Sequence, residues 1–294
     1  MAFENFKPMV WAAEIQQETE RMCVWAEDCN NRWEGKVKEA GESVKIRGVA
    51  APKITVITKG ERKTRLPDRE TLEDTSVIMY INQMATFDYE VDDLDAAQAD
   101  GDIKAHLNKS TSAGVASAMD QRIATVASGN DVPKLFKAPR KLVSGKAGAG
   151  EINILTLLDV AAQRLYENDV PTTGVKITAV LSPGALRLFT EAYSAGDTNN
   201  HELMKNGRVA MYHGITIKMS NNVYKDKDEN QHITVRTSEA IAFANPRVFT
   251  KPYSPDRGYS DAIKGYSLYD AMVVRPKEIV DAVVTVPNFD DEEV

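Results

Sequence analysis

The clearest strand alternation and the longest helical pattern of the chain follow each other between residues 86 and 128. Phe87, Tyr89 and Val91 alternate with acidic residues, which predicts a strand with one buried face. Residues 102–128 then contain no proline, and their large apolar residues recur at multiples of four positions. This spacing predicts a helix about 40 Å long whose apolar stripe turns gradually around its axis. We therefore expect a spine helix at 102–128 that crosses a whole domain.

Shorter patterned segments precede and follow this helix. Alternation or continuous apolar runs predict strands at residues 43–47, 76–81, 175–181, 215–217, 233–235, 239–244, 259–274 and 279–286. A period of about 3.6 residues predicts helices at 11–30, 154–167 and 183–193. Ser182 and Pro183 suit the N-cap and the first position of the last of these helices. The chain is therefore a mixture of helices and strands.

The segment at residues 49–75 differs from its neighbours because it has little apolar mass and segregated charges. Five basic residues and one acidic residue occur in residues 53–65, and four acidic residues and one basic residue in residues 66–74. A segment of this size between two strands, without enough apolar residues for a core, is typical of a protruding loop. We expect its charges to contact a neighbouring subunit. The expected contact residues are Lys59, Arg62, Lys63, Arg65, Asp68 and Arg69.

Trp11, Trp25 and Trp33 are the only tryptophans, and all three lie in the first segment of the chain. Two interpretations remain open at this point. The side chains either pack on the body of their own subunit, or they anchor an arm in another subunit, because aromatic residues are enriched at such interfaces. Under the second interpretation, Trp11 and Trp25 are inter-subunit contact residues.

Composition and charge narrow the function classes. The chain of 294 residues is 43% hydrophobic and 27% charged, as expected for a globular protein. We expect no signal peptide and no membrane span, because no apolar run is long enough for either. A net charge of −7 argues against tight sequence-specific nucleic-acid binding. The basic residues of the 134–141 segment have only Phe136 among them, which is little aromatic surface for a platform that stacks nucleobases.

Residue types that carry catalysis or bind metals are present, but not in the spacings that such sites require. The four histidines lie in different predicted elements, and Cys23 and Cys29 form neither a disulfide framework nor a metal set. The glycine-rich cluster at 145–150 has Ala147 after Lys146, where a phosphate-binding loop needs serine or threonine. We therefore expect no catalytic residue, no metal and no cofactor, and a structural function instead.

Three blocks of sequence carry a resemblance to a known family. Residues 207–223 read GRVAMYHGITIKMSNNV and are similar to a family pattern of two glycines around a short apolar stretch, an alternating strand and Ser-Asn. Residues 264–271 read KGYSLYDA and are similar to the closing strands, although Asp270 stands where a glycine is expected. The third block runs into the long helix and contains Phe87, Asp92, Asp95 and Gln98. Together they resemble the major capsid proteins of tailed bacteriophages, which have the Hong Kong 97-type fold.

The resemblance implies an α+β, Hong Kong 97-like capsid fold with four parts and a tail. These are an N-terminal arm at 1–40, an extended β-hairpin loop at 41–82, a peripheral domain at 83–150 and 259–288 built on the spine helix, an axial domain at 151–258, and an acidic tail at 289–294. Such a subunit assembles with copies of itself into hexamers and pentamers.

The same resemblance implies a function. We expect a non-enzymatic coat protein of an icosahedral virion capsid, assembled in the cytoplasm of a bacterial host around double-stranded DNA that it does not read by sequence. A separate scaffolding protein and a portal are expected partners, and we expect no cleaved N-terminal scaffolding segment because the arm pattern begins close to Met1. Two alternatives remain open: an encapsulin-like nanocompartment shell, and a soluble α/β enzyme with a deep polar pocket in residues 151–258.

Overall fold

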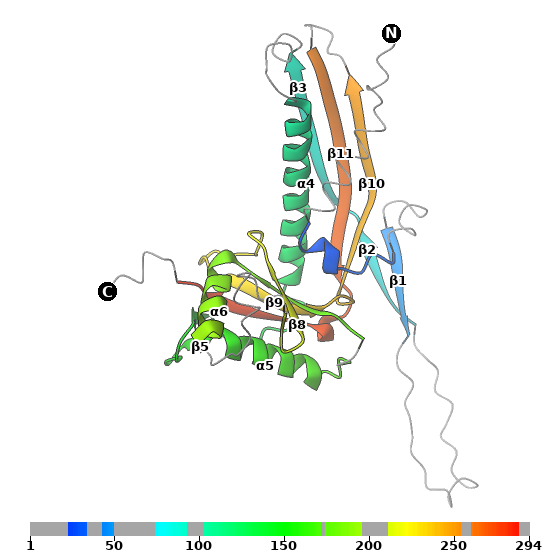
Figure 1. Cartoon of the computed structure of the whole chain (residues 1–294). Coiled ribbons are helices and arrows are strands. Elements are labelled where there is room, and N and C mark those ends of the chain that lie inside the picture. Colours follow the sequence, from blue (N-terminus) through cyan, green and yellow to red (C-terminus); the bar gives the residue numbers. More distant parts are fainter. Residues whose placement is uncertain are drawn as a thin grey trace, which may run out of the picture.

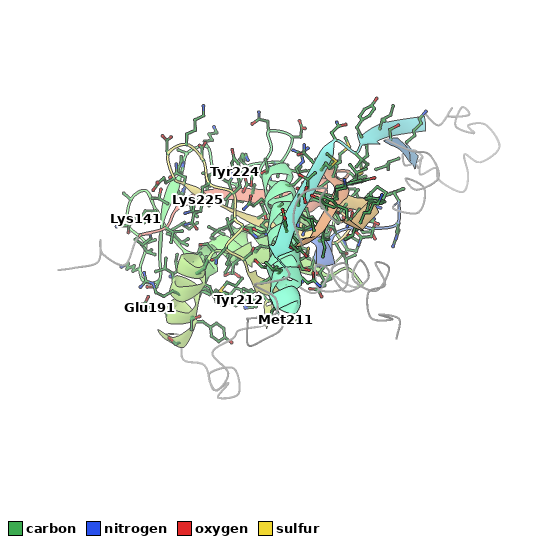
Figure 2. The ribbon with its side chains drawn as sticks, turned by 90° about the horizontal axis from the view of Figure 1, so that it is seen from above. Lys141, Glu191, Met211, Tyr212, Tyr224 and Lys225 are labelled. Atoms are coloured by element: carbon green, nitrogen blue, oxygen red, sulfur yellow. The ribbon has the colours of Figure 1, made fainter. Side chains whose placement is uncertain are left out.

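The computed structural model describes residues 23–33, 43–49, 74–92, 103–171, 174–195, 211–253 and 260–287. In these residues a long, narrow sheet with one helix along it joins a rounder part built on a second sheet (Figure 1). Viewed from above, the long helix lies between the bulk of the rounder part and the strands of the narrow sheet (Figure 2). Helices and mainly antiparallel sheets coexist, so the α+β class is confirmed.

The predicted spine helix is α4 (Ile103–Ala127), within one residue of the expected bounds. It runs along a three-stranded antiparallel sheet in the order β10-β11-β3. The strands of this sheet are β3 (Gln83–Asp92), β10 (Ile241–Tyr253) and β11 (Ser260–Val273). The predicted alternation on β3 is confirmed. Phe87 packs against the helix-side core and the Tyr89 hydroxyl donates to Asn108 Oδ1 of α4 over 2.9 Å, while Asp88 and Glu90 are exposed.

Gly265 allows the middle of this sheet to pack closely. It lies in the central strand β11 and pairs with Phe87 of β3. A Cβ at this position would meet the Phe87 ring and would lie 2.6 Å from the carbonyl oxygen of Phe249 on β10. Glycine is therefore the residue that lets the aromatic ring cross the strand here.

The second sheet has seven strands in the order β5-β4-β12-β9-β6-β8-β7. Its strands are β4 (Arg140–Val143), β5 (Glu151–Asn153), β6 (Ile177–Leu181), β7 (Met211–Tyr212), β8 (Ile215–Met219), β9 (Gln231–Thr237) and β12 (Ile279–Thr285). Every residue of β6 is buried, as predicted for a central strand. Its core is completed by side chains of α5 (Ile154–Glu167) and α6 (Pro183–Ala195).

Local capping explains where these two helices begin. Asn153 Oδ1 accepts from the Leu155 amide over 2.8 Å at the start of α5. Ser182 Oγ accepts from the Ala185 amide over 3.2 Å, which confirms the predicted N-cap of α6. The predicted bounds of α5 are identical to the observed ones.

Two short connections join the sheets. Residues 238–240 lead from β9 to β10, and η3 (Pro276–Glu278) leads from β11 back to β12. The connections are bonded to each other, because the Ala240 carbonyl oxygen accepts from the amides of Val274 over 2.9 Å and Arg275 over 3.2 Å. The chain therefore passes between the sheets twice at one place.

A third, two-stranded sheet forms the base of the expected extended loop. Strand β1 (Ser43–Val49) pairs antiparallel with β2 (Asp74–Tyr80), and Val49 lies opposite Asp74. The expected pair of bracketing strands is thus confirmed. The loop residues 50–73 lie outside the described residues, as do residues 288–294 with the acidic tail.

The sheets divide the chain differently from the expected domain boundaries. Strands β4 and β12, expected in the peripheral domain, belong to the seven-stranded sheet, whereas β10, expected in the axial domain, pairs with β11. The helix predicted at 11–30 is wrong in its described part, where residues 23–30 contain only the short turn η1 (Ala26–Asp28). Contacts to distant residues shape that segment, and its own periodicity does not show them.

Candidate functional site

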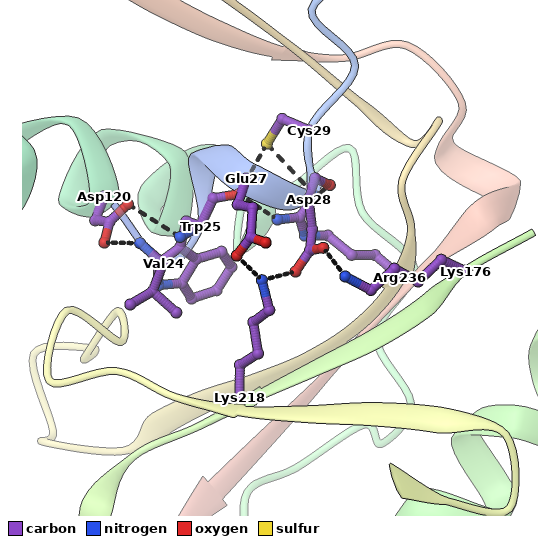
Figure 3. Close-up of polar contacts among 9 residues, drawn as sticks. All are labelled: Val24, Trp25, Glu27, Asp28, Cys29, Asp120, Lys176, Lys218 and Arg236. Carbon is purple, nitrogen blue, oxygen red and sulfur yellow. Dashed lines mark hydrogen bonds and ion pairs between the residues drawn. The ribbon is translucent and has the colours of Figure 1, made fainter. Parts of the chain in front are cut away.

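Residues 23–30 have no core of their own and are fixed to the body of the subunit by a polar cluster. Figure 3 shows this cluster between α4 and the seven-stranded sheet. We call it the arm anchor, and it consists of Val24, Trp25, Glu27, Asp28 and Cys29 together with Asp120, Lys176, Lys218 and Arg236. The arm anchor is therefore the site that fixes residues 24–29 of the expected arm to the body of the subunit.

A carboxylate from the spine helix binds the amide end of the turn. Asp120 Oδ2 accepts from the Val24 amide over 2.9 Å, and Asp120 Oδ1 accepts from the Trp25 amide over 3.0 Å. The Asp120 side chain is buried. Burial raises the pKa of Asp120, although the backbone amides and Arg236 act in the opposite direction. Asp120 therefore caps η1 from another element, in the way an N-cap residue caps a helix.

A guanidinium from the sheet binds the carbonyl end of the same turn. Arg236 lies on β9 and has no exposed surface. Its Nη1 donates to the Asp28 carbonyl oxygen over 2.5 Å, and its Nη2 donates to the Trp25 carbonyl oxygen over 2.9 Å. Its Cζ lies 5.6 Å from the centre of the Trp25 ring. Two fixed charges of opposite sign thus hold the two ends of one turn of the arm.

Ion pairs hold the side chains of the turn. Asp28 is 3% exposed and lies 2.6 Å from Lys176 Nζ and 2.7 Å from Lys218 Nζ. Lys218 Nζ also lies 2.5 Å from Glu27 Oε2. Burial acts to raise the pKa of Asp28, but the two lysines outweigh it and lower this pKa. Burial likewise acts to lower the pKa of Lys218, and Asp28 and Glu27 raise it overall.

The segment then joins the edge of the three-stranded sheet. The Asn30 amide donates to the Ile241 carbonyl oxygen over 2.8 Å, and the Phe243 amide donates to the Asn30 carbonyl oxygen over 3.2 Å. The Asn30 side chain donates to Glu239 Oε2 over 2.6 Å, and Arg32 pairs with Glu239 over 2.9 Å. Residues 23–30 therefore contact α4 and both large sheets.

The structure decides between the two interpretations for Trp25. Its side chain is 1% exposed and packs in the core of its own subunit with Ile123, Val180 and Ile279. The expectation of an inter-subunit contact is therefore wrong for Trp25. The other expected contact residues, Trp11, Lys59, Arg62, Lys63, Arg65, Asp68 and Arg69, lie outside the described residues.

Sequence reasoning missed the residues that bind the arm. Asp120 follows the buried Met119 on the face of α4 that also carries Ile123, and Arg236 follows the buried Val235 of β9. The signal in the sequence was a charged residue inside an otherwise apolar pattern. It indicates a buried ion or hydrogen-bond pair, because a buried charge needs a partner. The pattern does not reveal that Asp120 and Arg236 both find their partners in main-chain groups of residues 24–28.

Asp270 also has a defined role. Its Oδ1 lies 2.9 Å from Arg122 Nε of α4, and its Oδ2 accepts from the Asn82 amide over 3.2 Å. The position lies inside β11 opposite Ala244, so no turn requires glycine there. The carboxylate instead ties the spine helix and the β2–β3 connection to the central strand.

The described residues offer little that resembles an active site. No group of three or more metal-ligating side chains comes together within the described ranges. A solvent-open hollow of about 560 Å³ beside α5 is lined partly by Asp159 and His213, which lie 3.0 Å apart. Burial and Asp159 raise the pKa of Tyr212 to about 12. In the part of the chain that is described, no helix is both long and apolar enough to cross a membrane.

Comparison with known proteins identifies the fold. No protein-family model and no curated protein matches the chain. A solved structure of Mycobacterium phage Che8 is 21% identical, covers 88% of this chain and 90% of its own, and has a TM-score of 0.71. The mature capsid of bacteriophage PhiM1 is 18% identical over 88% of both chains, with a TM-score of 0.60. The chain has the tailed-phage capsid fold. The fold implied by the sequence resemblance is thereby confirmed.

A virus-like particle from Pyrococcus furiosus is also similar to this chain. It is 10% identical, covers 92% of this chain and 96% of its own, and has a TM-score of 0.54. The fold is therefore shared with a virus-like particle as well as with a phage capsid. Within this capsid fold, the arm anchor lies where the spine helix, the long sheet and the rounder part meet.

Proposed function

We propose that the chain is a major capsid protein that assembles with copies of itself, as hexamers and pentamers, into an icosahedral phage shell around double-stranded DNA. The observation that carries this proposal is the likeness to phage capsid structures over almost the whole length of both chains. On this proposal the protein is not an enzyme, belongs to the virion capsid, and is assembled in the host cytoplasm with a separate scaffolding protein and a portal.

Exposed apolar side chains support self-association. Val77, Ile78 and Tyr80 on β2, Met84 on β3 and Phe249 on β10 are between 39% and 56% exposed. Exposed apolar side chains of this size are typical of protein interfaces when a partner covers them. Strands β3 and β10 are also the two edges of the three-stranded sheet, and within the described residues Asn30 pairs with the β10 edge only at Ala242. A long edge of this kind is a template for contact with another chain. A second copy of the subunit meets both requirements.

We assign the four expected parts with boundaries that follow the sheets. The arm is residues 1–40, and the extended loop is residues 41–82. The peripheral domain combines β3 and α4 with β10 and β11, and the axial domain combines residues 140–237 with β12. We propose Trp11 and the loop residues Lys59, Arg62, Lys63, Arg65, Asp68 and Arg69 as contacts between subunits.

An encapsulin-like shell is the second candidate, because the Pyrococcus furiosus virus-like particle is similar in fold. The two candidates differ in content: a phage capsid holds nuclease-protected DNA, and a nanocompartment holds a cargo protein. Mass spectrometry and nucleic-acid extraction on nuclease-treated particles from phage-producing cells distinguish them. We expect protected double-stranded DNA and no stoichiometric cargo enzyme.

Assembly itself is tested on the purified full-length chain. We expect sedimentation velocity to show concentration-dependent capsomers or shells, and negative-stain images to show closed particles. A single species near the 32.5 kDa monomer mass at micromolar concentration, with the arm and loop resistant to protease, contradicts the proposal.

A further inference from the structure

One stretch of the described chain has a charge opposite to that of the rest. Residues 132–150 contain five basic residues and no acidic residue, whereas the whole chain has a net charge of −7. The basic residues are Lys134, Lys137, Arg140, Lys141 and Lys146. We call residues 132–150 the basic strip. It connects α4 to β5 and includes β4, near one edge of the seven-stranded sheet.

Within the described residues, only one of the five basic side chains forms an ion pair. Lys134 Nζ lies 2.5 Å from the buried carboxylate of Asp281 and 2.8 Å from the Ser128 carbonyl oxygen. Lys137, Lys141 and Lys146 are exposed, and no acidic group among the described residues forms an ion pair with them. Arg140 is also exposed, and its Cζ lies 4.5 Å from the centre of the Phe136 ring. Four cations therefore have no ion-pair partner among the described residues.

The backbone that carries these cations is held in place. Asn153 Nδ2 donates to the carbonyl oxygens of Ser144 and Gly145, each over 2.8 Å. The Lys141 amide donates to the Gly150 carbonyl oxygen over 3.1 Å. The acidic neighbour Glu151 accepts from the Gly148 amide over 2.9 Å, so its carboxylate is engaged within the loop. Cations on a fixed strand and loop lose little backbone entropy when they bind a polyanion.

We propose that the basic strip binds the phosphate backbone of double-stranded DNA, without reading its sequence. This inference rests on the proposed capsid function, which places DNA against the subunit. Phosphate contacts need only cations and backbone amides, and Lys146 is the only large side chain in the loop at 145–150. Nucleobase stacking is not required on a duplex, so the scarcity of aromatic residues is no objection. The partly buried Phe136 instead supports the Arg140 guanidinium.

Charge contrast also favours contact at this strip among the described residues. The rest of the chain has a net charge of −12 once the five basic residues are set aside. Most of the subunit therefore repels a polyanion, while a few cations attract it. Phosphate binding through four cations is weak and depends strongly on salt, with affinity falling about 150-fold between about 50 and 200 mM salt. Weak contacts of this kind hold DNA near a surface and still allow it to slide.

The test uses the full-length chain, kept unassembled at low concentration, and a labelled duplex of about 30 base pairs whose binding is followed by fluorescence anisotropy over a salt series. We expect a slope of log K against log salt of about −3.6 for the wild type. The triple variant K137Q/K141Q/K146Q, which retains Arg140, should reduce the slope to about −0.9. The matched variant K137R/K141R/K146R keeps the charges and should bind as the wild type does.

A second control changes lysines at the same end of the sheet. Lys225 forms an isolated β-bridge with Gln231 of β9. Strand β9 pairs with β12, and β12 pairs in turn with β4, the strand that carries Lys141 (Figure 2 labels Lys225 and Lys141). Lys225 and Lys227 alternate with acidic residues, so K225Q/K227Q should leave DNA binding unchanged. Wild-type subunits that do not bind DNA, or a triple Gln variant with an unchanged slope, overturn the proposal.

Particle formation separates this inference from the proposed function. We expect the triple Gln variant to form shells as the wild type does. If wild-type shells form but free subunits ignore DNA, the basic strip proposal fails and the capsid function stands. If the Gln variant fails to assemble while wild-type subunits show no affinity for DNA, the strip is a contact between copies, and the DNA proposal is again wrong. If no shells form at all, the proposed function fails.

Discussion

Arg236 Nη2 donates to the carbonyl oxygen of Trp25 over 2.9 Å, across 211 positions of sequence and inside the core. Because the same guanidinium also binds the Asp28 carbonyl oxygen, one side chain of the sheet determines where the arm turns. Asp120 fixes the other end of that turn from the spine helix. The path of the arm is therefore set by two distant charges.

Replacing Arg236 by lysine tests this clamp. Lysine keeps the charge but does not reach two carbonyl oxygens with a planar fork, so one buried acceptor loses its donor. We expect Arg236→Lys to lower the free energy of unfolding of the unassembled chain by about 2–3 kcal/mol in urea. The matched exposed change Arg164→Lys should stay within about 0.5 kcal/mol of the wild type. If Arg236→Lys and Arg164→Lys lower the free energy of unfolding by the same amount, the two hydrogen bonds of Arg236 to the turn do not stabilise the fold.

The two buried carboxylates of the arm anchor should respond to pH in opposite directions. The pKa of Asp28 is lowered by Lys176 and Lys218 against the effect of burial, so its stabilisation is present above the unfolded-state pKa of about 3.9 and is lost as the pH falls through the folded-state value. Asp28→Asn should therefore be less stable than the wild type at pH 7, and the difference should shrink in acid. The pKa of Asp120 is raised by burial, so its contribution is greatest below the unfolded-state pKa and is lost as the pH rises. We therefore expect the difference in the free energy of unfolding between the wild type and Asp120→Asn, measured by urea titration, to become smaller as the pH rises towards neutral.

Two glycines provide a matched pair for the long sheet and its helix. Gly265→Ala places a methyl group against the Phe87 ring and the Phe249 carbonyl oxygen, and we expect a loss of about 1–3 kcal/mol. Gly114 lies in α4, and nothing lies within 4 Å of the place that an added methyl group would take, so Gly114→Ala should gain about 0.5–1 kcal/mol. Thermal unfolding of both variants beside the wild type measures the two signs. A stable Gly265→Ala protein would show that β11 has room to shift.

We expect the Asp270 carboxylate to stabilise the fold through its contacts with Arg122 and the Asn82 amide. Asp270→Ala leaves the half-buried Arg122 and the Asn82 amide without their acceptor, and we expect a loss of about 2–3 kcal/mol. Asp270→Asn retains one acceptor oxygen and should lose less. Arg122→Gln, which removes the charge from the other side, serves as the partner in a double-mutant cycle. Additive effects in that cycle would show that the two residues do not interact.

The loop charges are tested in assembly. Arg62→Glu with Arg65→Glu should leave circular dichroism and melting near normal, because each exposed charge contributes at most about 1 kcal/mol. We expect assembly at low salt to fail and to return at raised salt, where repulsion is screened within about 10 Å or less. Normal assembly at low salt excludes an electrostatic contact. Unfolding of the variant would place these residues in a core.

Much of the fold was predictable where local patterning decides it. The bounds of α5 matched because Leu157, Leu158 and Leu165 repeat on one face, and α6 began at its own serine cap. Which strands pair with one another was not predictable in the same way. The apolar patterns of β10 and β12 identify strands, but the assignment of each to a sheet depends on pairing with residues far along the chain.

The candidate site was less predictable than the fold. A helix was expected through residues 23–30 because the apolar spacing fits one, yet buried charges from α4 and β9 bind the main chain there in a tighter turn. Nothing in the sequence around Trp25 distinguishes a core residue from an interface residue. Its neighbours Asp120 and Arg236 do carry a mark, because ionised groups at apolar positions require partners.

A tilt of the long sheet and α4 relative to the rounder part, centred on the paired connection at Ala240, would be amplified along α4. Two connecting segments lie side by side there, and the Ala240 carbonyl oxygen of one accepts from two amides of the other. Helix α4 has 25 residues and an arm length of about 38 Å, so a tilt of about 10° at the crossing moves its far end by about 6–7 Å. On the proposed capsid function, a tilt of this size would let a shell change its curvature without refolding its subunits.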